Sequence, residues 1–110
     1  MEAQHKNLAA GGWQKMSFRE QMGNIGGEIN RALYWRGKDG KLRDDSLIRA
    51  FELLDLTIAD SRWRLHLKEL TRVREVLSDA TLGGGEYGST LEDLDRYFFH
   101  FAFAARINRQ

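Results

Sequence analysis

The chain has no proline at any of its 110 positions. Proline removes a backbone hydrogen bond and clashes with the preceding turn, so it ends or kinks most helices that contain it. A chain without proline can form long uninterrupted helices, and here four segments carry apolar residues at helical spacing. No segment of comparable length shows the alternation of apolar and polar residues that is typical of strands. The sequence therefore predicts an all-α fold.

The predicted helices are joined by short connections. The four predicted helices cover residues 18–36, 46–59, 62–80 and 89–106. Short connections favour antiparallel neighbours, so we expect an antiparallel four-helix bundle that runs up-down-up-down. A chain of this length builds one hydrophobic core. We therefore expect a flexible N-terminal leader at residues 1–12 and a single four-helix domain at residues 13–110.

Boundary signals support these helices. Ser17 with Glu20, and Ser89 with Glu92, have the spacing of a capping box, which satisfies free N–H groups at a helix start. The other signals are Asp44, Asp45 and Ser46 before the second helix, Asp60 or Ser61 before the third, and Gly83 after the third. The apolar stripe of the third helix consists of Trp63, Leu67, Leu70, Val73 and Leu77.

The last predicted helix carries two apolar faces. Its core face consists of Leu91, Leu94, Tyr97, Phe98, Phe101, Ala102 and Ala105. Phe99 and Phe103 point away from that face, beside Arg96 and His100. A phenylalanine side chain buries about 150–250 Å², and small monomers seldom leave a contiguous apolar patch wet. We expect a second copy of the chain to cover this face in a homodimer; the alternatives are another protein, or the N-terminal segment with Trp13.

Charged residues also border the expected core. Arg74 falls in the inward arc of the third helix and His66 lies at its edge, while Glu28 and Asp55 border the stripes of the first two helices. A half-buried charge needs a partner because its desolvation is costly. We predict an ion pair of Arg74 with Glu28 or Asp55. The alternative is a small polar pocket inside the bundle for a ligand.

Three glycines lie close together in the first predicted helix. They are Gly23, Gly26 and Gly27. Each costs about 1 kcal/mol relative to alanine in a helix interior. We predict that they allow close packing against a bulky neighbour such as Trp63 or Tyr97. The alternatives are ligand access beside Asn24 and Glu28, or a kink.

Most kinds of catalytic chemistry have no counterpart in the sequence. There is no cysteine, and the Glu-x-x-His pattern, which di-iron bundles carry on two facing helices, occurs only once, at Glu2 and His5 near the N-terminus. No phosphate-binding loop or dinucleotide fingerprint occurs. We therefore expect no metal and no cofactor, and a protein that is not an enzyme. No apolar run could span a bilayer and the N-terminus lacks a signal-peptide core, so we expect a cytoplasmic protein with no membrane partner.

One basic strip could contact nucleic acid. Arg64, Lys68 and Arg72 share a stripe of the third helix, and the segment at residues 36–43 adds four basic residues beside two aromatic ones. Basic and aromatic residues together can hold single strands. The net charge is only +1, however, and acidic residues interrupt the strip. A face that is solvated, or paired with acidic residues of the second helix, is the preferred interpretation.

Five stretches carry a resemblance to known proteins: NIGGEINRALYWRG, AFELLDLTIAD, HLKELTRVREVL, EYGST and YFFHFAFAAR. They resemble a group of short uncharacterised bacterial proteins over about residues 13–106, which implies a compact helical domain and no particular activity. The chain is more loosely similar to HEPN domains, helical bundles that often dimerise and sometimes cleave RNA.

The HEPN motif is an arginine and a histidine separated by four to six residues, with a polar residue after the arginine. Here three residues separate Arg96 from His100, and Tyr97 follows the arginine. This departure from the motif puts ribonuclease activity in doubt. The sequence thus predicts a non-enzymatic interaction module that self-associates through the Phe99 and Phe103 face. The alternative is a HEPN-like protein that binds or cleaves RNA.

Overall fold

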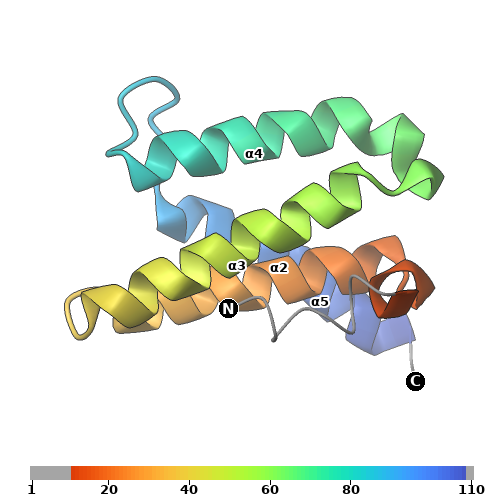
Figure 1. Cartoon of the computed structure of the whole chain (residues 1–110), viewed down its shortest axis with the longest axis horizontal. Helices are drawn as coiled ribbons and strands as arrows, with labels where there is room; N and C mark the ends of the chain where they lie inside the picture. The colour runs from red at the N-terminus through yellow and green to blue at the C-terminus, as the bar shows by residue number, and fades with distance from the viewer. Residues whose placement is uncertain (1–10, 109–110) are drawn as a thin grey trace.

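The computed structural model describes residues 11–108, and within them the chain forms helices and no strand. The elements are η2 (Trp13–Lys15), α2 (Phe18–Trp35), α3 (Gly40–Ile58), η3 (Ser61–His66), α4 (Leu67–Thr81) and α5 (Leu91–Asn108). The four long helices alternate in direction along the bundle (Figure 1). The predicted all-α four-helix architecture is confirmed. Residues 1–10, which make up most of the predicted leader, lie outside the described part.

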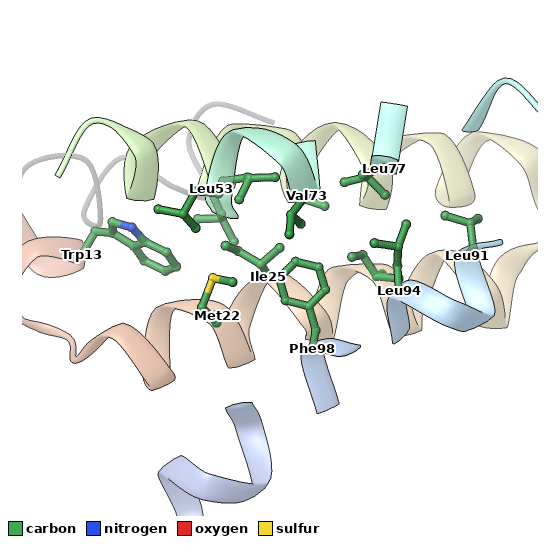
Figure 2. Packing of buried hydrophobic residues seen from close by; sticks show 13 residues of the cluster. Trp13, Met22, Ile25, Leu53, Val73, Leu77, Leu91, Leu94 and Phe98 are labelled. Carbon is green, nitrogen blue, oxygen red and sulfur yellow. The ribbon is translucent and has the colours of Figure 1, made fainter. Parts of the chain in front are cut away.

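Helix α2 is the centre of the bundle. It packs along both α3 and α5, while α4 contacts α3 and α5 more lightly. All four helices contribute to one core, shown in Figure 2. Its buried members are Trp13, Met22, Ile25, Ile29, Ala50, Leu53, Leu54, Leu70, Val73, Leu77, Leu91, Leu94 and Phe98. No helix among the described residues has both the length and the apolar character needed to cross a membrane.

Trp13 belongs to this core, although it precedes the first long helix. Its indole is completely buried at one end of the cluster (Figure 2). The indole Nε1 donates a hydrogen bond to Oγ1 of Thr57 on α3, at 3.2 Å. The expectation that Trp13 could cover Phe99 and Phe103 is therefore wrong, because its side chain is already packed between other elements.

Helix α3 begins earlier than predicted. The carboxylate of Asp39 accepts hydrogen bonds from the backbone N–H groups of Lys41 and Leu42, at 3.0 and 3.1 Å. This cap starts the helix at Gly40, so the predicted start at residue 46, with caps at 44–46, is wrong. Aspartate at a helix N-cap is favoured because its oxygen satisfies N–H groups that have no partner within the helix.

The third predicted helix is interrupted. Residues Ser61–His66 form the 3₁₀ helix η3, and Trp63 has non-helical angles of φ −104° and ψ 27°. Asp60 caps this segment by accepting from the N–H of Arg62, as predicted. Because the helix axis changes after η3, Leu67 is 43% exposed and does not join the core as predicted. The remaining α4 stripe of Leu70, Val73 and Leu77 is buried as predicted.

The start of α5 lies one position from the predicted capping box. Thr90 and Asp93 form the reciprocal pair, with the N–H of Thr90 donating to Asp93 and the N–H of Asp93 donating to Oγ1 of Thr90, at 2.9 and 3.1 Å. The predicted pair of Ser89 and Glu92 is therefore wrong. The predicted core face is correct for its buried members, Leu91, Leu94 and Phe98.

Two of the three α2 glycines allow α5 to approach. A Cβ added to Gly26 would lie 2.6 Å from Cβ of Phe98, and one added to Gly23 would lie 3.0 Å from Cα of Ala102. The predicted close packing is confirmed at these two positions. The neighbours are residues of α5 rather than Trp63 or Tyr97, and α2 runs through this region without a break.

Candidate functional site

The outer face of α5 exposes three large apolar side chains. Phe99, Phe103 and Ile107 are 55%, 51% and 50% exposed. They recur every four residues and therefore share one face of the helix. The rings of Phe99 and Phe103 stack with centroids 6.3 Å apart. We call these three residues the α5 stripe.

Charged residues flank the α5 stripe on both sides. At about 100° per residue, His100 lies on the flank away from α2, while Arg96 continues the line of the stripe one turn before Phe99 and is turned from Phe99 toward that same flank. Arg96 forms an ion pair with Asp93 while its side chain stays 70% exposed. His100 lies beside Phe99, with ring centroids 6.4 Å apart. On the α2 side, Asp95 accepts a hydrogen bond from Nδ2 of Asn30 at 3.3 Å.

Two adjoining hollows run along the seam between α2 and α5. Their volumes are about 290 and 230 Å³. They share Gly23, Gly27, Ala102 and Arg106 as lining residues, and Phe99 lines the larger one. We call them the seam hollows. The α5 stripe and the seam hollows together form one face with a ridge and a depression side by side.

The polar residues predicted to border the core, Glu28, Asp55, His66 and Arg74, do not lie together in the structure. Glu28 is buried, and two arginines hold its carboxylate. Arg31 of α2 approaches with Nη2 at 3.0 Å, and Arg49 of α3 approaches with Nε at 3.2 Å. The predicted pairing of Glu28 with Arg74 is therefore wrong. Arg49 was missed because it lies outside the apolar stripe of α3, so helical period alone assigns it to solvent.

Arg74 pairs with Asp55, which was the other partner predicted for it. Its Nε and Nη2 approach the two carboxylate oxygens at 2.6 and 3.2 Å. Both side chains are on the surface, 42% and 53% exposed, rather than in the interior. The pair therefore crosses from α4 to α3 on the outside of the bundle and forms no polar pocket with Glu28.

His66 lies at a different place, the end of the bundle where η3 meets α2 and α5. Its ring stacks on Phe18 with centroids 4.2 Å apart. A groove of about 840 Å³ opens here, lined by Ser17, Phe18, Arg19, Glu20, Trp63, His66, Glu69, Phe101 and Ala105. Glu69 accepts from the hydroxyl of Tyr97 at 2.6 Å, and burial together with this carboxylate raises the pKa of the Tyr97 phenol. The groove combines the aromatic rings of Phe18, Trp63, His66 and Phe101 with polar residues, and its two carboxylates already have protein partners.

A buried polar network ties η2, α2 and η3 together. The side chain of Gln21 donates to the carbonyl of Trp13 at 2.8 Å and to Asp60 at 3.3 Å, and accepts from Nε1 of Trp63 at 2.9 Å. Arg62 pairs with Asp60 at 2.7 Å, and its hydrogen bonds lower the pKa of that carboxyl to about 2. All donors and acceptors named here are satisfied, so the network stabilises the fold and offers no free group for chemistry.

The basic strip is solvated. Arg64 and Lys68 are exposed and have no acidic partner among residues 11–108. The guanidinium of Arg72 lies over the ring of Tyr87, 4.8 Å from its centroid. Three acidic residues of α3, Asp44, Asp45 and Asp55, pair with Arg43, Lys41 and Arg74 instead, so they do not neutralise the strip.

The described residues contain no cluster of three or more acidic or histidine side chains that could hold a metal ion. No protein-family model, curated protein or solved structure matches the chain. The resemblance to HEPN domains stays a prediction. The α5 stripe places three large exposed apolar side chains on one helix face, next to the seam hollows.

Proposed function

We propose that the protein is a non-enzymatic helical module that associates with a second copy of itself through the α5 stripe. The observation that carries this proposal is the exposure of Phe99, Phe103 and Ile107 at helical spacing. The opposite face of α5 already fills the core through Phe98. The stripe is therefore surplus to folding, and a contiguous apolar patch on a small protein is typical of an interaction site.

The size of the stripe sets the expected affinity. Two phenylalanines can bury about 150–250 Å² each, whereas a standard interface buries about 800 Å² per partner. The stripe is thus the centre of the interface and the flanking residues of α2 and α5 must supply the rest. We expect a dimer with a Kd on the order of micromolar, at the weaker end for specific interfaces.

Sedimentation velocity over a concentration series tests this proposal. Phe103→Asp places a charge in the stripe and is expected to give a folded monomer. The matched control is Leu82→Asp, because Leu82 is 85% exposed in the turn after α4 and outside the stripe. Dimerisation that survives Phe103→Asp, or that is lost equally in the control, would overturn the proposal.

A second candidate function rests on the basic strip. Arg64 and Lys68 face solvent, and Arg72 stacks on Tyr87, so cations and an aromatic ring share one surface of η3 and α4. Such a surface suits the backbone and bases of single-stranded RNA. Binding of an oligouridine at low salt should be lost on Arg64→Ala with Arg72→Ala and kept on Lys15→Ala with Arg19→Ala, two exposed basic residues outside the strip. No binding at low salt removes this candidate, since phosphate contacts strengthen as salt falls.

A further inference from the structure

Gly27 is a glycine that the chain itself does not require. It lies inside α2 with a helical backbone, unlike the glycines with positive φ in the loops. A Cβ at this position would meet only Nη2 of Arg31, at an ordinary 3.7 Å. Gly23 and Gly26, by contrast, are pressed against α5. Because glycine costs about 1 kcal/mol in a helix interior, the absence of a side chain at position 27 needs a reason outside the monomer.

Gly27 lines both seam hollows, directly beside the α5 stripe. A side chain at this position would project into space that the described residues leave empty. The depression and the neighbouring ridge are on the same face of the molecule, since Phe99 lines the larger hollow. Two copies of such a face are complementary, because the ridge of each can occupy the depression of the other.

We infer that the seam hollows receive the α5 stripe of a second copy of this chain, an inference that rests on the proposed self-association. For each stripe to enter the hollows of the other copy, the two-fold axis must lie between the copies and parallel to α5. The two α5 helices then run parallel to each other. An antiparallel pair would set stripe against stripe and leave the hollows empty. Gly27 is then the position at which the partner's stripe approaches the α2 backbone.

The charges beside the stripe agree with this arrangement. Parallel pairing brings the α2-side flank of one α5 against the outer flank of the other at the same height. Among residues 11–108, Asp95 on the first flank accepts a hydrogen bond only from the neutral amide of Asn30, at 3.3 Å. Arg96, turned from Phe99 toward the outer flank, pairs with Asp93 of its own helix and is still 70% exposed. Asp95 of one copy therefore faces Arg96 of the other, twice in the symmetric dimer.

Gly27→Leu tests the inference by filling the hollow. The matched control is Gly40→Leu: Gly40 opens α3, and a Cβ there would likewise meet only an arginine guanidinium, with its nearest atom at 3.6 Å. We expect Gly27→Leu to stay monomeric at concentrations where the natural protein and Gly40→Leu are dimers, with a helical circular dichroism spectrum like that of the natural protein.

A charge exchange tests the same arrangement without touching the glycine. Asp95→Arg and Arg96→Asp should each weaken dimerisation about tenfold or more, and the double exchange should restore it, because close charge pairs across an interface are coupled. If Phe103→Asp is a monomer while Gly27→Leu still dimerises, or if the double exchange restores nothing, self-association stands and this inference is overturned. A natural protein that never dimerises would overturn both.

Discussion

Phe98 of α5 lies directly on Gly26 of α2, so closely that a Cβ added to the glycine would be 2.6 Å from Cβ of the phenylalanine. This contact sets the distance between the two helices and fixes the rotation of α5 about its axis. With Phe98 turned into the core, the neighbouring Phe99 must turn outward. The close approach inside the bundle and the apolar ridge outside it are therefore two consequences of one helix orientation.

Alanine at positions 26 and 27 should act in opposite directions. Gly26→Ala should lower the free energy of unfolding by about 1–3 kcal/mol. The added methyl group would collide with Cβ of Phe98, which cannot move without shifting the backbone of α5. Gly27→Ala should raise the stability of the monomer by up to about 1 kcal/mol, because helix propensity improves and nothing is displaced. Urea denaturation at a concentration where the protein is monomeric measures both changes. Equal signs for the two variants would contradict the account of α2.

Asp60 should make stability depend on pH in acid. Its pKa falls from 3.8 in the reference state to about 2 in the folded protein, mainly because Arg62 donates hydrogen bonds to it. A lowered carboxyl pKa stabilises the fold above about pH 4, and this contribution is lost as the pH falls toward 2. Asp60→Asn should therefore cost about 1–2 kcal/mol near neutrality and progressively less toward pH 2. Urea denaturation over this pH range tests it, and a variant whose deficit is constant across the range would speak against the mechanism.

Glu28 should matter more than Asp55, although both form ion pairs with arginine. Glu28 is buried and held by Arg31 and Arg49, so Arg49→Ala removes one of its two partners and should cost about 1–3 kcal/mol. Arg74→Ala removes a surface pair with Asp55 and should cost at most about 1 kcal/mol. Thermal or urea unfolding of the two variants gives the comparison directly. Similar losses would mean that burial does not separate the two pairs.

Trp13 should be a structural residue of the domain despite its position before α2. Trp13→Ala removes a completely buried indole and should cost about 3–5 kcal/mol. Gln14→Ala, at an exposed neighbour, is the control and should be close to neutral. Chemical denaturation followed by circular dichroism avoids the loss of tryptophan signal. A stable Trp13→Ala variant would show that η2 is not part of the cooperative unit.

Helical period was a sufficient guide where a segment has a continuous backbone. The buried positions Leu70, Val73 and Leu77 on α4, and the outward direction of Phe99 and Phe103 on α5, follow from spacing alone. The pattern failed where local hydrogen bonds change the backbone. Asp39 starts α3 inside a segment that looks like a loop, and η3 rotates the start of α4 so that the apolar pattern no longer describes it.

Partners across elements were harder to predict than faces. Arg49 reaches Glu28 from a position that looks solvent-facing, and Gln21 is a buried hub that carries no motif. Long polar side chains bend toward charges over several ångströms, so their partners depend on tertiary placement rather than on spacing. The seam hollows also depend on tertiary placement, because the distance between α2 and α5 determines them. The glycines of α2 are the only related signal in the sequence.

The mass of the protein in solution tests the central claim most directly. Light scattering over a concentration series should show the natural protein moving from the mass of one chain to twice that mass, while Phe99→Asp stays at one chain with an unchanged helical spectrum. A natural protein that keeps the mass of one chain up to the highest concentration, or a Phe99→Asp variant that dimerises like it, would contradict the claim that the α5 stripe is a self-association surface.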